Sequence, residues 1–120
     1  MKYLCLVCFD GKEIDKFTAD GWKEMQRASA AYDDELAHSG HYIMAQALES
    51  IDSATTVRVR NGKMSTTDGP FAETKEQVAG FILIEAADLN EAIRIAGGIP
   101  LATIGSIEVR PIMDFKTGLQ

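Results

Sequence analysis

The chain lacks the long apolar runs and the basic excess that would assign it to a membrane or to nucleic acid. No apolar run approaches the roughly 18 residues that a membrane-spanning helix needs, so we expect no membrane partner. The formal net charge is −6 at pH 7. Because binding to a phosphate backbone draws on clustered Lys and Arg, nucleic acid is not an expected partner either. Residues 1–3 lead directly into a strand-like segment with poor flanks for a signal peptide, so we expect a cytoplasmic protein.

Cysteine and histidine are scarce, and the common catalytic motifs are missing. Cys5 and Cys8 form a C-x-x-C pattern, but on a strand residues three apart point to opposite faces, so we predict two buried, unreactive thiols. His38 and His41 have a spacing that suits neither a helical metal pair nor a three-ligand zinc site. No Ser-His-Asp set, phosphate loop or dinucleotide fingerprint is present. The sequence therefore predicts no metal and no cofactor, and it singles out no catalytic residue.

The composition is that of one ordinary globular domain. The 120 residues are 46% hydrophobic and 25% charged, and a chain of this length buries about two-thirds of its unfolded surface on folding. We therefore expect a single domain over residues 1–120.

Hydrophobic periodicity predicts six strands and two helices in the order β-α-β-β-β-β-α-β. Thr18 is a suitable N-cap for a long amphipathic helix that ends near Gly40 and carries charged residues such as Asp33 on its solvent side. Asp88, with Glu91 three residues later, forms an acidic capping box before a short helix. A single helical turn is expected over residues 72–77. The predicted strands span residues 2–9, 41–48, 55–60, 63–67, 80–87 and 106–110, the last confined to an edge by Pro111.

Asn61 and Gly62 give the strongest two-residue hairpin signal in the chain, because both tolerate the positive φ of a type I′ turn. The register that follows pairs Val59 with Met64, Val57 with Thr66, and Arg58 with Ser65. The whole order is a split βαβ plan with a β-hairpin inserted in its middle.

The segment DGPFAETKEQ at residues 68–77 joins a rigid turn to a cluster of charges. Asp68, Gly69 and Pro70 are turn-forming residue types. With GFILIEA and the downstream DLNEA and GSIEVRPI, the segment resembles the signature of the DGPF-type branch of the YCII-related proteins, and the resemblance extends to Ile112. It implies one YCII-related (DGPF) domain with a ferredoxin-like α+β fold that pairs into a dimeric α/β barrel, in a family whose biochemical role is largely unassigned.

A homodimer also follows from the residues themselves. Two helices cover one face of a sheet, yet the runs at residues 3–9 and 81–84 are apolar on both faces. An exposed apolar face of that extent is unusual for a soluble monomer, and a second copy packed face to face is the simplest cover.

Five residues near the turn are candidates for ligand binding: Asp68, Phe71, Glu73, Lys75 and Arg58. Asp68 could act as a general base or ligand contact, or its oxygens could only accept N–H bonds in an Asx turn. Glu73 and Lys75 could supply binding charges or belong to a solvated turn. Phe71 could stack on a ligand or anchor the core. Arg58 could receive an anion, remain an ordinary exposed residue or pair with Glu108.

Two functions stay open. YciI-type relatives carry a proposed His/Asp active-site pair with the His in the first helix, whereas here His38 comes only in the last turn of that helix, so this chemistry does not transfer. The first function is binding of a small molecule in a cleft shaped by the DGPF turn. The second is a cofactor-free enzyme of the isomerase, lyase or hydrolase type, using a carboxylate such as Asp68 or Glu73 for proton transfer. A perturbed carboxylate facing an apolar pocket would favour the enzyme.

Overall fold

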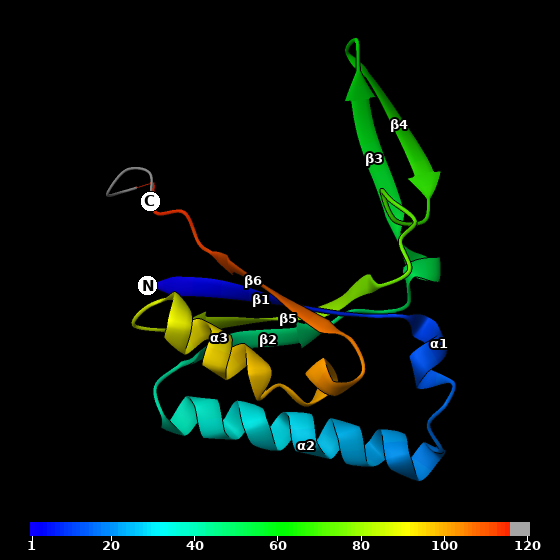
Figure 1. Cartoon of the computed structure of the whole chain (residues 1–120). Coiled ribbons are helices and arrows are strands. Elements are labelled where there is room, and N and C mark those ends of the chain that lie inside the picture. Colours follow the sequence, from blue (N-terminus) through cyan, green and yellow to red (C-terminus); the bar gives the residue numbers. More distant parts are fainter. Residues whose placement is uncertain (116–120) are drawn as a thin grey trace.

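The structure, a computed structural model, describes residues 1–115 and consists of an antiparallel sheet, helices on one of its faces and a two-stranded arm (Figure 1). None of the helices in this part of the chain is long and apolar enough to cross a membrane. The elements in chain order are β1 (Lys2–Phe9), α1 (Gly11–Ile14), α2 (Ala19–His38), β2 (Tyr42–Ala47), the 3₁₀ turn η1 (Ile51–Ser53), β3 (Thr55–Arg60), β4 (Lys63–Asp68), β5 (Gln77–Glu85), α3 (Leu89–Gly97), the 3₁₀ turn η2 (Pro100–Thr103) and β6 (Ser106–Pro111).

The main sheet has four strands in the order β2-β5-β1-β6, with all neighbours antiparallel. The two most apolar strands, β1 and β5, are central, as their sequences predict. β6 lies at an edge, where the missing N–H of Pro111 costs no ladder bond. This α+β arrangement fits a ferredoxin-like fold. The eight predicted elements occur in the predicted order, and the short helix α1 is added after β1.

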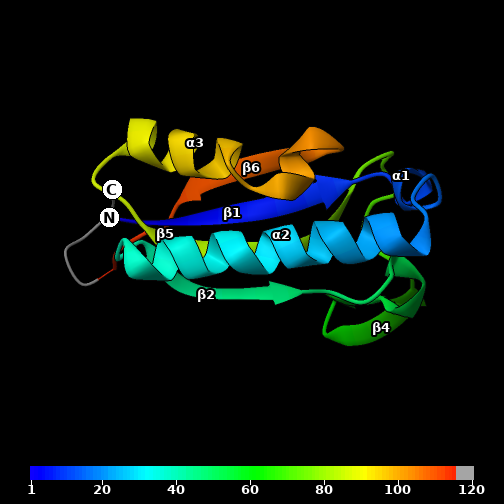
Figure 2. The ribbon, with the colours of Figure 1, turned by 90° about the horizontal axis from the view of Figure 1, so that it is seen from below.

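The hydrophobic core lies between this sheet and the helices. In β1 the buried side chains are Tyr3, Cys5, Val7 and Phe9, and burial alternates along the whole strand. Residues of β5, α2 and α3 complete the same cluster. Figure 2 shows α2 and α3 side by side across one face of the sheet. In the single chain the central strands are therefore buried on one face.

The opposite face carries the other set of alternate side chains and is called the open face below. On the central strands its apolar residues pair across β1 and β5, namely Leu4 with Leu83, Leu6 with Phe81 and Cys8 with Val78. Val78 is exposed, and the other five are half-buried. In Figure 1 both long helices lie on the far side of the sheet from this face. The sequence predicted that these strands are apolar on both faces. In the structure the helices cover one of these faces, and the other is the open face.

The inserted hairpin, β3 and β4, forms a separate two-stranded sheet that we call the arm. Asn61 has φ 54° and Gly62 has φ 75°, the positive values that a type I′ turn requires. Val59 pairs with Met64, and the rest of the predicted register is confirmed. In Figure 1 the arm rises from one end of the main sheet on the side away from the helices.

Local capping chemistry sets the helix ends. The side chain of Thr18 accepts a hydrogen bond from the Gly21 N–H at 3.0 Å, and that of Asp88 accepts one from the Glu91 N–H at 2.9 Å. These caps were predicted from the sequence. The long helix α2 ends at His38, close to the predicted end.

The predicted helical turn over residues 72–77 is wrong. β5 already begins at Gln77, and the preceding residues form bends. The side-chain amide of Gln77 donates to the carbonyls of Ala72 at 3.1 Å and Thr74 at 3.0 Å, which holds this connection without a helix. A four-residue helix that the sequence did not predict, α1, follows β1, and Asp10 caps it.

Candidate functional site

The backbone of Gly69 holds the DGPF turn. Gly69 has φ +101°, a conformation that an L side chain rarely adopts. Its N–H donates to the Ala54 carbonyl at 2.8 Å, and its carbonyl accepts from the Thr56 hydroxyl at 2.8 Å. The turn is thereby tied to the base of the arm.

Asp68 is exposed at the end of β4, opposite Thr55. Within residues 1–115 no donor reaches its carboxylate, so the Asx turn considered from the sequence does not form. Phe71 is 82% exposed and does not anchor the core of this chain. Arg58 is half-buried in β3, and Glu108 pairs with Arg110 instead.

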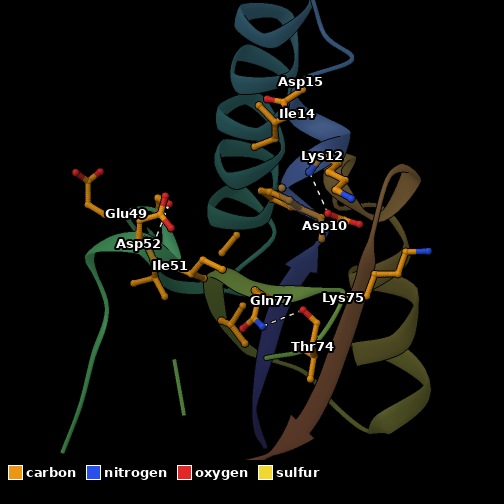
Figure 3. A pocket seen from close by; sticks show the side chains of 16 residues that line it. Asp10, Lys12, Ile14, Asp15, Glu49, Ile51, Asp52, Thr74, Lys75 and Gln77 are labelled. Carbon is orange, nitrogen blue, oxygen red and sulfur yellow. Dashed lines mark hydrogen bonds between the residues drawn. The ribbon is translucent and has the colours of Figure 1, made fainter. Parts of the chain in front are cut away.

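An open pocket of about 920 Å³ lies beyond the carboxyl end of β1. Three segments far apart in sequence form its walls, namely α1 with its flanking residues, the loop from β2 into η1, and the connection that leads into β5 (Figure 3). Of the five residues proposed from the sequence, Lys75 lines this pocket, and the other four lie outside it. The lining residues are Phe9, Asp10, Gly11, Lys12, Ile14, Asp15, Leu48, Glu49, Ser50, Ile51, Asp52, Thr74, Lys75, Gln77, Val78 and Ala79.

Hydrogen bonds from side chains to nearby backbone shape these walls. Asp10 accepts from the Lys12 N–H at 3.0 Å and turns the chain into α1. The Ser50 hydroxyl accepts from the Asp52 N–H at 3.2 Å and starts η1. Gln77 holds the third wall through the two carbonyl contacts described above. Each wall is therefore fixed by its own sequence, while the sheet brings the three together.

The pocket combines apolar residues with charges of both signs. Six lining residues are apolar, six are charged, and four of the charged ones are acidic. Figure 3 shows Glu49 and Asp52 on one side of the pocket and Lys12 and Lys75 on the other. None of the six charged groups forms an ion pair with any residue that the structure describes. Asp10 accepts the backbone hydrogen bond from Lys12, and the other five charged side chains are available to a ligand.

A family model for the YCII-related domain matches residues 1–116. The chain belongs to the YCII-related domain family. It is also 33% identical over 120 residues to an uncharacterized protein of Rhizobium meliloti (strain 1021), and the match covers 98% of this chain and 97% of that protein. The resemblance carried by the DGPF segment is thus confirmed.

A second and smaller pocket of about 210 Å³ lies between α2 and the sheet of this YCII-related domain. Tyr32, Asp33 and Ser29 line it from the helix. The Tyr32 hydroxyl donates to the Ile95 carbonyl at 2.6 Å. A Cβ at position 98 would lie 2.3 Å from that hydroxyl oxygen, so Gly98 provides the space for this bond.

The Asp33 carboxylate has a perturbed pKa. Burial raises its pKa, and the neighbouring Asp34 carboxylate raises it further. Its side chain has no hydrogen-bond or ion-pair partner in the described part of the chain. The sequence placed Asp33 on the solvent side of the helix because of its type. The signal that was missed is its position four residues after Ser29, which lies on the inner stripe.

Cys5 is buried and Cys8 is only half-buried, so the prediction of two buried thiols holds for Cys5 alone. Cys5 is fully buried in the core, where burial raises its pKa to about 11. Cys8 lies on the open face, and burial, followed by the carboxylates of Glu108 and Glu76, raises its pKa. The prediction that the two thiols point to opposite faces is confirmed. Among residues 1–115 no three His, Cys, Asp or Glu side chains are grouped to hold a metal ion.

Proposed function

We propose that this YCII-related protein is a homodimer that binds a small molecule in the pocket beyond the carboxyl end of β1. The observation that carries the proposal is a pocket that combines apolar lining residues with charges of both signs that form no ion pair among the described residues. A volume of about 920 Å³ lies within the roughly 300–1,000 Å³ that is usual for small-molecule sites. The DGPF turn contributes by leading the chain to Lys75, and its own side chains stay outside the pocket.

The lining favours a small zwitterion with an apolar part. Lys12 and Lys75 offer ammonium groups to a carboxylate or phosphate group. Glu49 and Asp52, on the opposite side, accept hydrogen bonds from an amine. Six apolar residues of the lining would contact the rest of the ligand.

Two observations support the homodimer. The open face leaves the apolar side chains of the central strands without cover from the helices. The Cα radius of gyration is 16.4 Å, whereas a compact domain of this length has a value of about 14 Å. A second copy on the open face would remove this surface from water and give a compact assembly.

The ligand proposal is tested by a thermal-shift screen of small zwitterions on four proteins. These are the wild type, Lys12→Gln/Lys75→Gln, Glu49→Gln/Asp52→Asn, and a control, Lys23→Gln, which changes an exposed lysine of α2 outside the pocket. A hydrogen bond to a charged group contributes about 1.5–3 kcal/mol. Each double variant should therefore bind the ligand at least ten-fold more weakly, and the control should bind it as the wild type does. Ligands that stabilise all four proteins equally would place the binding site elsewhere.

Asp33 favours a second function, a cofactor-free enzyme that uses a carboxylate for proton transfer. Its raised pKa brings it closer to the working range of a general base, and it lines a pocket with apolar walls. Asp68 and Glu73, the carboxylates proposed from the sequence, are exposed and outside both pockets. If the enzyme function holds, Asp33 is its base.

Asp33→Asn tests the environment on which this second function depends. Because the folded-state pKa is raised, the native state binds the proton more tightly than the unfolded state, and stability falls as pH rises through the shifted range. Asp33→Asn should therefore melt at a higher temperature than the wild type at pH 7. The difference should disappear below about pH 3.9, where the unfolded carboxylate is also protonated. Calorimetry measures the difference, with Asp68→Asn as the control because Asp68 is exposed and outside both pockets. Equal effects of both substitutions at every pH would remove Asp33 as a candidate.

A further inference from the structure

We propose that the arm is a clasp that holds a second copy of this chain. The proposal adds a second contact surface to the proposed homodimer and does not depend on the identity of the ligand. It follows from the exposure, the position and the charge of the arm.

One face of the arm is apolar and uncovered. Val57 is 56% exposed, Val59 is 60% exposed and Met64 is 71% exposed. Val59 and Met64 are direct cross-strand partners, so these side chains form a continuous patch. An isolated two-stranded hairpin is marginally stable in water, and it needs packing against another surface to persist. We therefore expect another molecule to pack against this patch.

The position of the arm indicates where that cover comes from. The arm rises at one end of the main sheet, on the side of the open face (Figure 1). The arm therefore projects from the sheet at the border of the open face. The molecule measures 48 × 47 × 18 Å along its principal axes, so it is broad in two directions and thin in the third. A second copy packed on the open face would lie beside the arm. In a two-fold dimer each arm would contact the other subunit in the same way.

Charge favours a second copy as the occupant. The arm contains Arg58, Arg60 and Lys63 and no Asp or Glu between residues 55 and 67, while the whole chain has a formal net charge of −6. No described carboxylate pairs with these three cations. These cations lie on the face of the arm opposite the apolar patch. They favour the approach of another copy of this acidic chain through long-range attraction.

Sedimentation equilibrium on the full chain tests the apolar part of this surface. The variant is Val57→Ser/Val59→Ser/Met64→Ser, and the matched control is Leu89→Ser/Ile93→Ser, which changes two apolar residues of α3 with 48% and 53% exposure. The arm variant should dimerise at least ten-fold more weakly than the wild type, and the control should match the wild type. Circular dichroism checks that the main domain of each variant is folded. An arm variant that is folded and dimerises like the wild type overturns the proposal.

A charge-reversal variant tests the electrostatic part without changing the apolar patch. Arg58→Glu/Arg60→Glu/Lys63→Glu should weaken dimerisation at least ten-fold at low ionic strength, and added salt should reduce the difference from the wild type. Unchanged dimerisation at low salt counts against the clasp.

A further variant, Leu6→Gln/Leu83→Gln, alters the open face alone and separates the two proposals. If it is monomeric while both arm variants remain dimeric, the clasp is wrong and the homodimer stands. If the wild type itself is monomeric at micromolar concentration, both are wrong.

Discussion

At the scale of single residues, the DGPF turn depends on its backbone more than on its carboxylate. Asp68→Ala removes an exposed side chain that accepts no bond from the described residues, so stability should change by less than about 0.5 kcal/mol. Gly69→Ala should cost about 1–2 kcal/mol, because φ is +101° and both backbone groups are hydrogen-bonded. Urea unfolding measures both. A loss above 1 kcal/mol in Asp68→Ala would restore the structural role that an Asx turn gives to this residue.

Residue type and spacing predicted some individual positions and not others. The opposite directions of Cys5 and Cys8 follow from strand geometry alone, and the structure confirms them. Phe71 and Asp33 could not be placed in this way. Phe71 is apolar yet 82% exposed, because its surroundings depend on packing and not on residue type. Asp33 stands at the border of the helix stripe, where a charged type does not show how deeply the side chain is buried.

At the scale of elements, local chemistry made most of the fold predictable. The N-caps Thr18 and Asp88 and the Asn61-Gly62 turn act within a few residues of themselves, so their signals survive in one sequence. The four-residue helix α1 is too short for periodicity to register. The bends before β5 depend on Gln77 folding back on two carbonyls, a contact that residue propensities do not encode.

The pocket was not predictable from the sequence because its lining residues come from three segments that are far apart in the chain. Its walls come from residues 9–15, 48–52 and 74–79. They meet because β5 lies between β2 and β1 in the sheet, so the segments that flank these strands gather at one end of it. The sequence placed the candidate site at the DGPF turn, and only its downstream residue Lys75 reaches the pocket.

At the scale of the whole molecule, the pattern of the central strands predicted a homodimer, and the structure identifies the surface on which to test it. Val7 and Ile84 are 5% and 0% exposed and belong to the core under the helices, so substitutions there would report on folding. Leu6 and Leu83 lie on the open face. Polar substitutions of these two residues report on assembly with less effect on the core.

Cys8 provides a direct measure of whether the open face is covered. It lies on that face two residues after Leu6 and pairs with Val78. Its raised pKa leaves little of the reactive thiolate at neutral pH, so the labelling needs an alkaline pH. At pH 9, alkylation of Cys8 by iodoacetamide should slow as protein concentration rises through the range of dimer formation. Cys5 should stay unmodified at every concentration, because it is fully buried with a pKa of about 11.

The Leu6→Gln/Leu83→Gln variant is the control for this measurement, because it keeps Cys8 and changes the apolar contacts around it. In the variant, the alkylation rate of Cys8 should be independent of concentration and equal to the rate of dilute wild type. Mass spectrometry of the labelled peptides separates Cys8 from Cys5. A wild type that sediments as a dimer while Cys8 reacts at a constant rate would show that two copies meet through another surface, because a reagent cannot reach a thiol that lies between two packed sheets.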